Sequence, residues 1–156
     1  MGLLRDNDRK QLQAELGKMQ NPVKLVFFTQ ATDCDYCEIT KQVLEELVPL
    51  SDKIHLQTYD FATDKPAAAQ YKIARVPAIA ILRLEPPAVL VAGNESPRER
   101  DYGIRYYGVP AGFEFASLVG DIMDVSLGES GLSEASKATL KQLQAPVHLQ
   151  VFATPT

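Results

Sequence analysis

The sequence lacks several features that would place it in a common structural class. Its 156 residues include no tryptophan, two histidines and only two cysteines. Two cysteines are too few for the disulfide framework of a small secreted protein. A chain of this length can bury roughly 70% of the surface that its unfolded form exposes, so it needs no such cross-links for a core. With 46% hydrophobic and 23% charged residues, we expect one folded domain, or one domain and part of another.

The sequence also lacks an excess of positive charge and any long apolar run. Its net charge is -4 and its pI about 5.2, so no basic field would attract a phosphate backbone, and we expect no nucleic-acid partner. No stretch approaches the ~20 apolar residues of a membrane span. Residues 1–19 are rich in charges and glutamine and contain no apolar core of a secretory signal. We therefore expect a cytoplasmic protein that does not bind a membrane.

The hydrophobic pattern predicts an α/β domain with the element order β-α-β-α-β-β-α, preceded by an extra helix. Residues 23–29 form a run of β-branched and aromatic side chains, typical of a strand buried on both faces. Residues 54–60 alternate between apolar and polar, as a strand does. The other predicted elements are helices over 6–19, from 32 to 48, over 63–71 and 113–127, and strands over 77–84 and 102–109. This order favours two parallel strands joined by a helix, with an antiparallel hairpin added.

The connection over residues 85–101 is expected to be a solvated loop. It contains three prolines and ends in the charged run 98–101. A short strand extension is predicted within it at residues 89–91.

The end of the sequence repeats its beginning. When residues 16–32 are aligned with residues 140–156, seven of the seventeen positions are identical. Chance would give roughly one identity, so a structural repeat is the better interpretation. We predict a first unit over residues 1–128 and, over residues 129–156, the helix (133–144) and first strand (147–152) of an incomplete second unit. A complete protein whose tail shares only an amphipathic pattern with its head is the alternative.

The two cysteines form a Cys-x-x-Cys motif, Cys34-Asp35-Tyr36-Cys37. The motif follows a predicted buried strand, and Cys34 is expected at or just inside the first turn of the next helix. The free N–H groups and the dipole of a helix N-terminus favour a thiolate there. Cys34 is then the exposed nucleophile, and Cys37, one turn deeper, can attack a mixed disulfide at Cys34. The negative charges of Asp33 and Asp35 oppose the helix dipole at this site.

A second candidate element is Val76-Pro77 at the start of a predicted strand. Proline is tolerated at the first position of a strand. A cis peptide bond here would bring this loop against the cysteines and leave the backbone of Val76 free to pair with an extended substrate. An ordinary trans proline is the alternative. The candidate substrate-binding residues are Val76, Pro77 and Tyr36.

These motifs together resemble the thioredoxin/glutaredoxin fold. The extra N-terminal helix, the segments NPVKLVFF, CDYC, ARVPA and GIRYYGVPAGFEF, and the repeat are similar to the protein disulfide oxidoreductases, glutaredoxin-like proteins with tandem thioredoxin-fold units. The resemblance covers nearly the whole chain. It implies that Cys34 attacks, that Cys37 resolves the mixed disulfide, that Pro77 is cis, and that the chain acts in cytosolic redox homeostasis.

The expected function is exchange between protein or peptide dithiols and disulfides with no cofactor beyond the cysteines. A thioredoxin-reductase-like flavoprotein is a candidate electron partner.

Two other functions compete with this one. A zinc site built from the cysteines with His55 and His148 lacks the close second ligand pair of such sites, so we expect no metal. A redox-inert docking module within a larger redox assembly keeps the fold without the chemistry. The tandem-thioredoxin domain of the flavoprotein component of alkyl hydroperoxide reductase has this architecture, and one of its units has lost the cysteine pair.

The strand predicted at residues 147–152 has no partner strand in the sequence. A lone strand exposes unpaired backbone groups and is unstable in water. It can fold back on an edge of its own sheet or pair with a neighbouring chain. Pairing with a second copy satisfies both the backbone and the apolar face, so we expect a homodimer.

Overall fold

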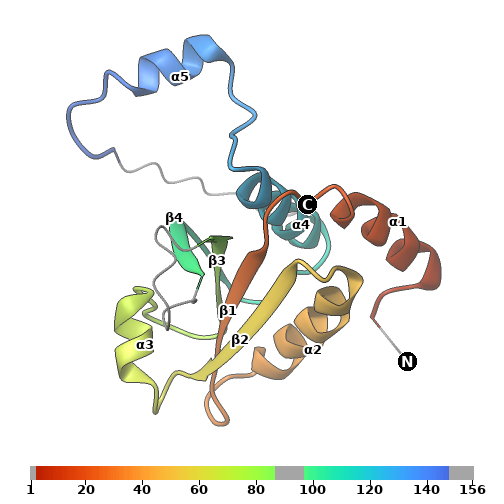
Figure 1. The fold of residues 1–156 in the computed structure, drawn as a ribbon. Coiled ribbons are helices and arrows are strands. Elements are labelled where there is room, and N and C mark those ends of the chain that lie inside the picture. Colours follow the sequence, from red (N-terminus) through yellow and green to blue (C-terminus); the bar gives the residue numbers. More distant parts are fainter. Residues whose placement is uncertain (1–2, 87–96, 148–156) are drawn as a thin grey trace, which may run out of the picture.

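A four-stranded mixed sheet forms the centre of the computed structural model, which describes residues 3–86 and 97–147 (Figure 1). Its strand order is β2-β1-β3-β4. The strands are β1 (Val23–Thr29), β2 (Ile54–Asp60), β3 (Ala78–Glu85) and β4 (Arg98–Tyr107). β1 is parallel to β2 and antiparallel to β3, and β4 is antiparallel to β3. The predicted arrangement of a β-α-β unit and an antiparallel hairpin is therefore confirmed.

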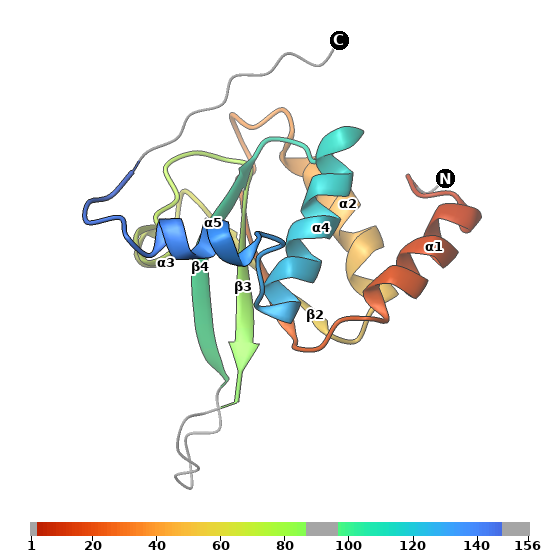
Figure 2. The same ribbon diagram turned by 90° about the horizontal axis from the view of Figure 1, so that it is seen from above.

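Helices cover both faces of this sheet. They are α1 (Asp6–Leu16), α2 (Cys37–Leu47), α3 (Lys65–Gln70) and α4 (Phe113–Leu127). A 3-10 turn, η1 (Val48–Leu50), follows α2, and a further helix, α5 (Glu134–Leu140), follows α4. Figure 2 shows α2 and α4 side by side on one face with α1 outside them, while α3 lies on the other face.

Alternate side chains of β1 reach two separate cores. Leu25 and Phe27 are fully buried in the larger core, which α1, α2 and α4 share with β3. Val26 and Phe28 are fully buried in the smaller core beneath α3. Both faces of β1 are thus covered, which explains why its sequence is apolar without alternation. β1 is the strand that leads directly into the cysteine motif.

The structure corrects the prediction for residues 98–101. These residues are not part of a loop but open β4 and pair with β3, with Arg98 opposite Glu85 and Glu99 opposite Leu84. Long-range ion pairs stabilise the charged run in the strand, including one between Glu99 and Lys24 of β1. The strand predicted at 89–91 lies outside the described residues.

The chain after α4 has a helix where the repeat predicts one, although α5 ends at Leu140 rather than at residue 144. None of the α5 residues is buried, and the helix lies apart from the sheet (Figure 1). Leu140, Leu143 and Val147 are all more than half exposed. The strand predicted at 147–152 lies, apart from Val147, outside the described residues.

Candidate active site

Cys34 and Cys37 are joined by a disulfide bond, with S–S 2.00 Å and Cα–Cα 5.5 Å. They lie where the chain leaves β1 and enters α2. Cys37 is the first residue of α2 and is only 3% exposed, whereas Cys34 is half-buried. Of the two cysteines, only Cys34 is therefore accessible to a reaction partner.

The position of Cys34 corrects the sequence prediction. α2 begins at Cys37 rather than near Thr32, so Cys34 precedes the helix instead of lying in its first turn. Asp33 has a positive φ of 55°, which no α-helix can include. The four motif residues form a turn, in which the Cys37 N–H donates to the Cys34 carbonyl oxygen at 3.4 Å.

Tyr36 is held by its backbone and exposes its ring. Its carbonyl oxygen accepts hydrogen bonds from the N–H of Thr40 at 3.1 Å and from the buried Thr40 hydroxyl at 2.8 Å. The Tyr36 side chain is 62% exposed beside the disulfide. This exposure places a large aromatic surface where a partner of Cys34 would approach.

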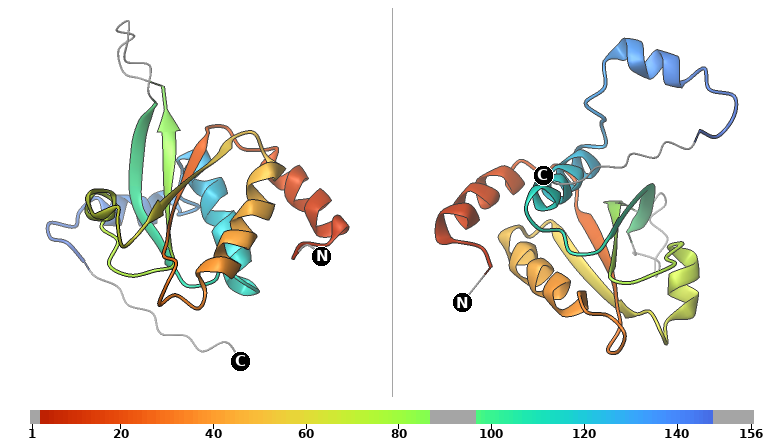
Figure 3. Two further views of the ribbon diagram at one scale, coloured as in Figure 1. Left: turned by 90° about the horizontal axis from the view of Figure 1, so that it is seen from below. Right: turned by 180° about the vertical axis from the view of Figure 1, so that it is seen from behind.

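The loop between α3 and β3 lies at the same end of the sheet as the loop between β1 and α2 (Figure 3). The first loop contains Val76 and Pro77, and the second contains the cysteine motif. Phe28, near the end of β1, pairs with Ala78 at the start of β3, so the segments that flank these two residues are neighbours. The Val76-Pro77 peptide bond is cis, as the family resemblance implies. The Val76 backbone has no hydrogen-bond partner among residues 3–86 and 97–147.

The loop between β4 and α4 also reaches this end of the sheet. The Gly108 N–H donates to the carbonyl oxygen of Pro77 at 3.1 Å, which fixes the start of this loop against the proline. Sequence reasoning missed this loop as part of the site. The only signal was its run of glycine, valine and proline before α4.

Acidic side chains dominate the charge near the disulfide. Asp33, Asp35 and Glu38 are exposed, and none takes part in the ion pairs of the described chain. On the Val76 side, the guanidinium of Arg75 lies over the ring of Tyr107 at 4.7 Å from its centroid. The exposed charged residues next to the two cysteines in the chain are therefore acidic.

The described residues contain no group of three or more His, Cys, Asp or Glu side chains able to hold a metal ion. His55 lies exposed in β2, and His148 is outside the described residues. No helix among the described residues has the length and apolarity to cross a membrane.

Comparison with solved structures identifies the fold. The chain matches a protein disulfide oxidoreductase from Aeropyrum pernix with TM-score 0.71 and 28% identity, over 89% of this chain and 55% of that one. It matches the NTD_N/C domain of the alkylhydroperoxide reductase AhpF from Enterococcus faecalis with TM-score 0.70 and 26% identity, over 88% and 59%. The chain has a thioredoxin-like fold.

A second structure of the Enterococcus faecalis AhpF protein matches with TM-score 0.71 and 26% identity, over 90% of this chain and 61% of that one. The thioredoxin-like chain thus spans a little over half the length of these relatives. No protein-family model matches the sequence, and no match was found among the curated proteins.

Proposed function

We propose that the chain is a thiol–disulfide oxidoreductase that exchanges protein or peptide dithiols and disulfides through Cys34 and Cys37. The disulfide between the two motif cysteines, with one residue half-buried and the other almost fully buried, carries this proposal. The similarity to a protein disulfide oxidoreductase supports it.

In the reductive direction, the Cys34 thiolate attacks one sulfur of a substrate disulfide. A mixed disulfide forms at Cys34, and the other half of the substrate leaves as a thiolate that takes up a proton. The Cys37 thiol, having lost its proton, then attacks Cys34 and releases the second substrate thiol. The protein dithiol loses two electrons and the substrate gains them. In the oxidative direction the same steps run in reverse.

The free backbone of Val76 supports a role in substrate binding. An extended segment next to a substrate cysteine can form β-type hydrogen bonds with the Val76 N–H and C=O. The exposed Tyr36 ring offers apolar contact on the other side of Cys34. We propose that Val76, Pro77 and Tyr36 orient the substrate sulfur toward Cys34.

Two variants test the assignment of roles. Cys34→Ser should abolish exchange with hydroxyethyl disulfide, and Cys37→Ser should accumulate a mixed disulfide at Cys34 that mass spectrometry detects. If limiting alkylating reagent modified Cys37 before Cys34 in the reduced protein, the assignment would be wrong. A redox-inert docking module predicts no exchange at all.

The direction of the reaction depends on the reduction potential of the pair. Known carriers span roughly -270 mV for reductants to -120 mV for oxidants. Equilibration with glutathione buffers measures where this pair lies. Both cysteines belong to one redox motif, which fits a reducing compartment, so we propose a role in cytoplasmic thiol homeostasis with a thioredoxin-reductase-like flavoprotein as electron partner.

We also propose that residues 129–156 begin a second thioredoxin-fold unit. Leu16 and Met19 are at most 2% exposed in the first unit, whereas Leu140 and Leu143, their equivalents in the repeat, are 51% and 54% exposed. Leu140 and Leu143 therefore expose apolar surface that would be buried in the core of a complete second unit.

The predicted homodimer rests on the same segment. Sedimentation velocity of the chain and of a version ending at Leu127 tests it. A dimer that is lost on truncation is expected, and two monomers at tens of micromolar would contradict it.

A further inference from the structure

We propose that an apolar pocket beside the disulfide binds a bulky apolar side chain of a positively charged, cysteine-containing polypeptide substrate. The inference rests on the exchange function proposed above and adds the substrate class to it.

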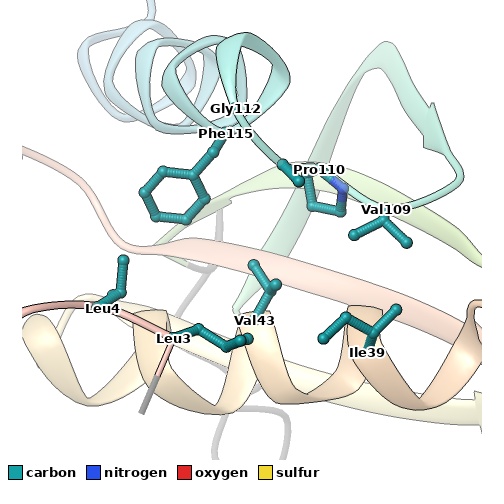
Figure 4. Close-up of a pocket in the computed structure, with 9 residues that line it drawn as sticks. Leu3, Leu4, Ile39, Val43, Val109, Pro110, Gly112 and Phe115 are labelled. Atoms are coloured by element: carbon teal, nitrogen blue, oxygen red, sulfur yellow. The ribbon is translucent and has the colours of Figure 1, made fainter.

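The pocket lies between α2, α4, the loop that joins β4 to α4, and the N-terminal segment (Figure 4). Its volume is about 310 Å³. All nine lining residues are apolar or glycine: Leu3, Leu4, Ile39, Val43, Val109, Pro110, Ala111, Gly112 and Phe115. A pocket without a polar side chain selects an apolar occupant, because a buried polar group would lose its hydrogen bonds to water.

Two walls of the pocket lie close along the chain to residues of the candidate active site. Ile39 lies in the first turn of α2, two residues after Cys37, and Val43 follows one turn further along the helix (Figure 4). On the opposite wall, Val109 directly follows Gly108, whose N–H is bound to the Pro77 carbonyl oxygen. A polypeptide paired with the Val76 backbone and attached to Cys34 would therefore meet the loop that forms one wall of this pocket.

The size of the pocket fits one large side chain. An engineered apolar cavity of roughly 150 Å³ is enough to bind benzene, so about 310 Å³ accommodates a leucine or phenylalanine side chain. Full burial of such a side chain corresponds to roughly a tenfold to hundredfold gain in affinity.

Charge complementarity defines the rest of the substrate. Asp33, Asp35 and Glu38 are exposed next to Cys34 and Cys37 in the chain and have no ion-pair partner among the described residues, while Arg75 is stacked on Tyr107. Lysine or arginine near the substrate cysteine would meet these carboxylates, and acidic residues would be repelled. The occupant is thus an apolar and basic segment around a disulfide-bonded cysteine.

Four peptide disulfide dimers test this substrate class. Each peptide carries one cysteine, with either leucine or serine and either lysine or glutamate at the neighbouring positions. Single-turnover reduction by the reduced chain is followed by chromatography of the peptide thiol, and each rate is divided by the rate for hydroxyethyl disulfide. The leucine–lysine peptide should react about 10 to 100 times faster than the serine–glutamate peptide.

Variants then assign the preference to the pocket. Val43→Phe fills it and should reduce the leucine-over-serine ratio to near one, whereas Gln42→Phe, on an exposed position of the same helix, should keep the ratio. Phe115→Ala removes the opposite wall and provides a second test if Val43→Phe does not fold. In the oxidised chain, a leucine–lysine peptide without cysteine should shift the methyl resonances of Ile39, Val43 and Val109.

The experiment distinguishes failure of the pocket proposal from failure of the proposed exchange function. Equal relative rates for leucine and serine peptides, with normal hydroxyethyl disulfide reduction, would overturn the pocket proposal alone. Absence of any exchange with hydroxyethyl disulfide would overturn the proposed function, and the substrate assignment would fall with it.

Discussion

The ammonium of Lys24 in β1 lies 2.6 Å from a carboxylate oxygen of Glu99 in β4, and this ion pair spans the intervening strand β3. The other carboxylate oxygen of Glu99 accepts a hydrogen bond from the Tyr71 hydroxyl at 2.9 Å. Burial and the bond to Glu99 raise the pKa of Tyr71 far above its usual value, so it stays protonated. The three side chains connect β1 and β4 with the residue that follows α3.

Glu99→Gln should lower the free energy of unfolding by about 2 kcal/mol, because it leaves the partly buried Lys24 ammonium without its counter-charge. Urea unfolding of the oxidised protein measures this loss. Glu129→Gln, at an exposed position without an ion pair, is the control and should change stability by less than about 0.5 kcal/mol. Equal midpoints for the two variants would show that the network contributes nothing.

A second prediction concerns Gly128, the residue that ends α4 with φ 74°. A Cβ atom at this position would lie 1.9 Å from the Nη1 atom of Arg83. Gly128→Ala therefore combines the strain of a positive φ, about 1 kcal/mol, with displacement of the Arg83 guanidinium. Gly103→Ala has φ 85° but open space around the new methyl group, so it isolates the backbone contribution.

Thermal unfolding of both alanine variants gives the difference. Gly128→Ala should be the less stable by up to about 1 kcal/mol, because the Arg83 guanidinium is the end of a flexible side chain and can move aside. Addition of Arg83→Ala should recover most of that difference, since the clash is then gone. Similar melting temperatures for the two glycine variants would contradict the packing of Arg83 against Gly128.

The sequence predicts those elements whose signal is local. The bounds of β1, β2 and α4 agree with the prediction, because an unbroken apolar run, a clean alternation and a helical stripe closed by Gly128 each identify one element. The prediction for residues 98–101 is wrong, since their charges are typical of a loop. Their actual partners, Lys24 among them, are distant in sequence.

In the candidate site, too, the features with a local sequence signal were predictable and the others were not. Cys34 and Cys37 follow from a motif of four residues, and Val76-Pro77 from its place before a strand. The predicted start of α2 is too early, because sequence does not reveal the positive φ of Asp33. The apolar pocket could not be predicted, since it forms where three distant segments meet and each is apolar for a local reason.

Charge next to the nucleophile gives a third prediction. In the reduced protein, we expect the negative charges of Asp33 and Asp35 to oppose formation of the Cys34 thiolate. Asp33→Asn and Asp35→Asn should each raise the rate of Cys34 alkylation by iodoacetamide at neutral pH about twofold to threefold. Asparagine tolerates the positive φ at position 33, so the backbone is preserved.

Asp52→Asn is the matched control, since Asp52 is exposed in the turn before β2 and far along the chain from the motif. It should leave the alkylation rate unchanged. Slower alkylation of the Asp33 or Asp35 variants would mean that these carboxylates assist the thiolate instead of opposing it.

The last prediction concerns Glu46, which anchors the N-terminal wall of the pocket. Its carboxylate accepts hydrogen bonds from the Leu3 and Leu4 N–H groups and pairs with Arg9. The two backbone bonds, followed by the charge of Arg9, lower the pKa of Glu46 from its ordinary value. A carboxyl whose pKa is lower in the folded state stabilises that state above its unfolded pKa. The stabilisation is lost as pH falls through the lowered value.

The anchor should therefore be intact at about pH 6 and released on acidification below the ordinary carboxyl range. Amide exchange at Leu3 and Leu4 should be slow at the higher pH and should accelerate, relative to the intrinsic rate, as Glu46 takes up its proton.

Glu46→Gln should release the segment at every pH and reduce the preference for leucine peptides, because Leu3 and Leu4 line the pocket. Glu45→Gln, at the neighbouring exposed position, should do neither. Unchanged protection of Leu3 and Leu4 in Glu46→Gln would show that apolar packing alone holds this wall.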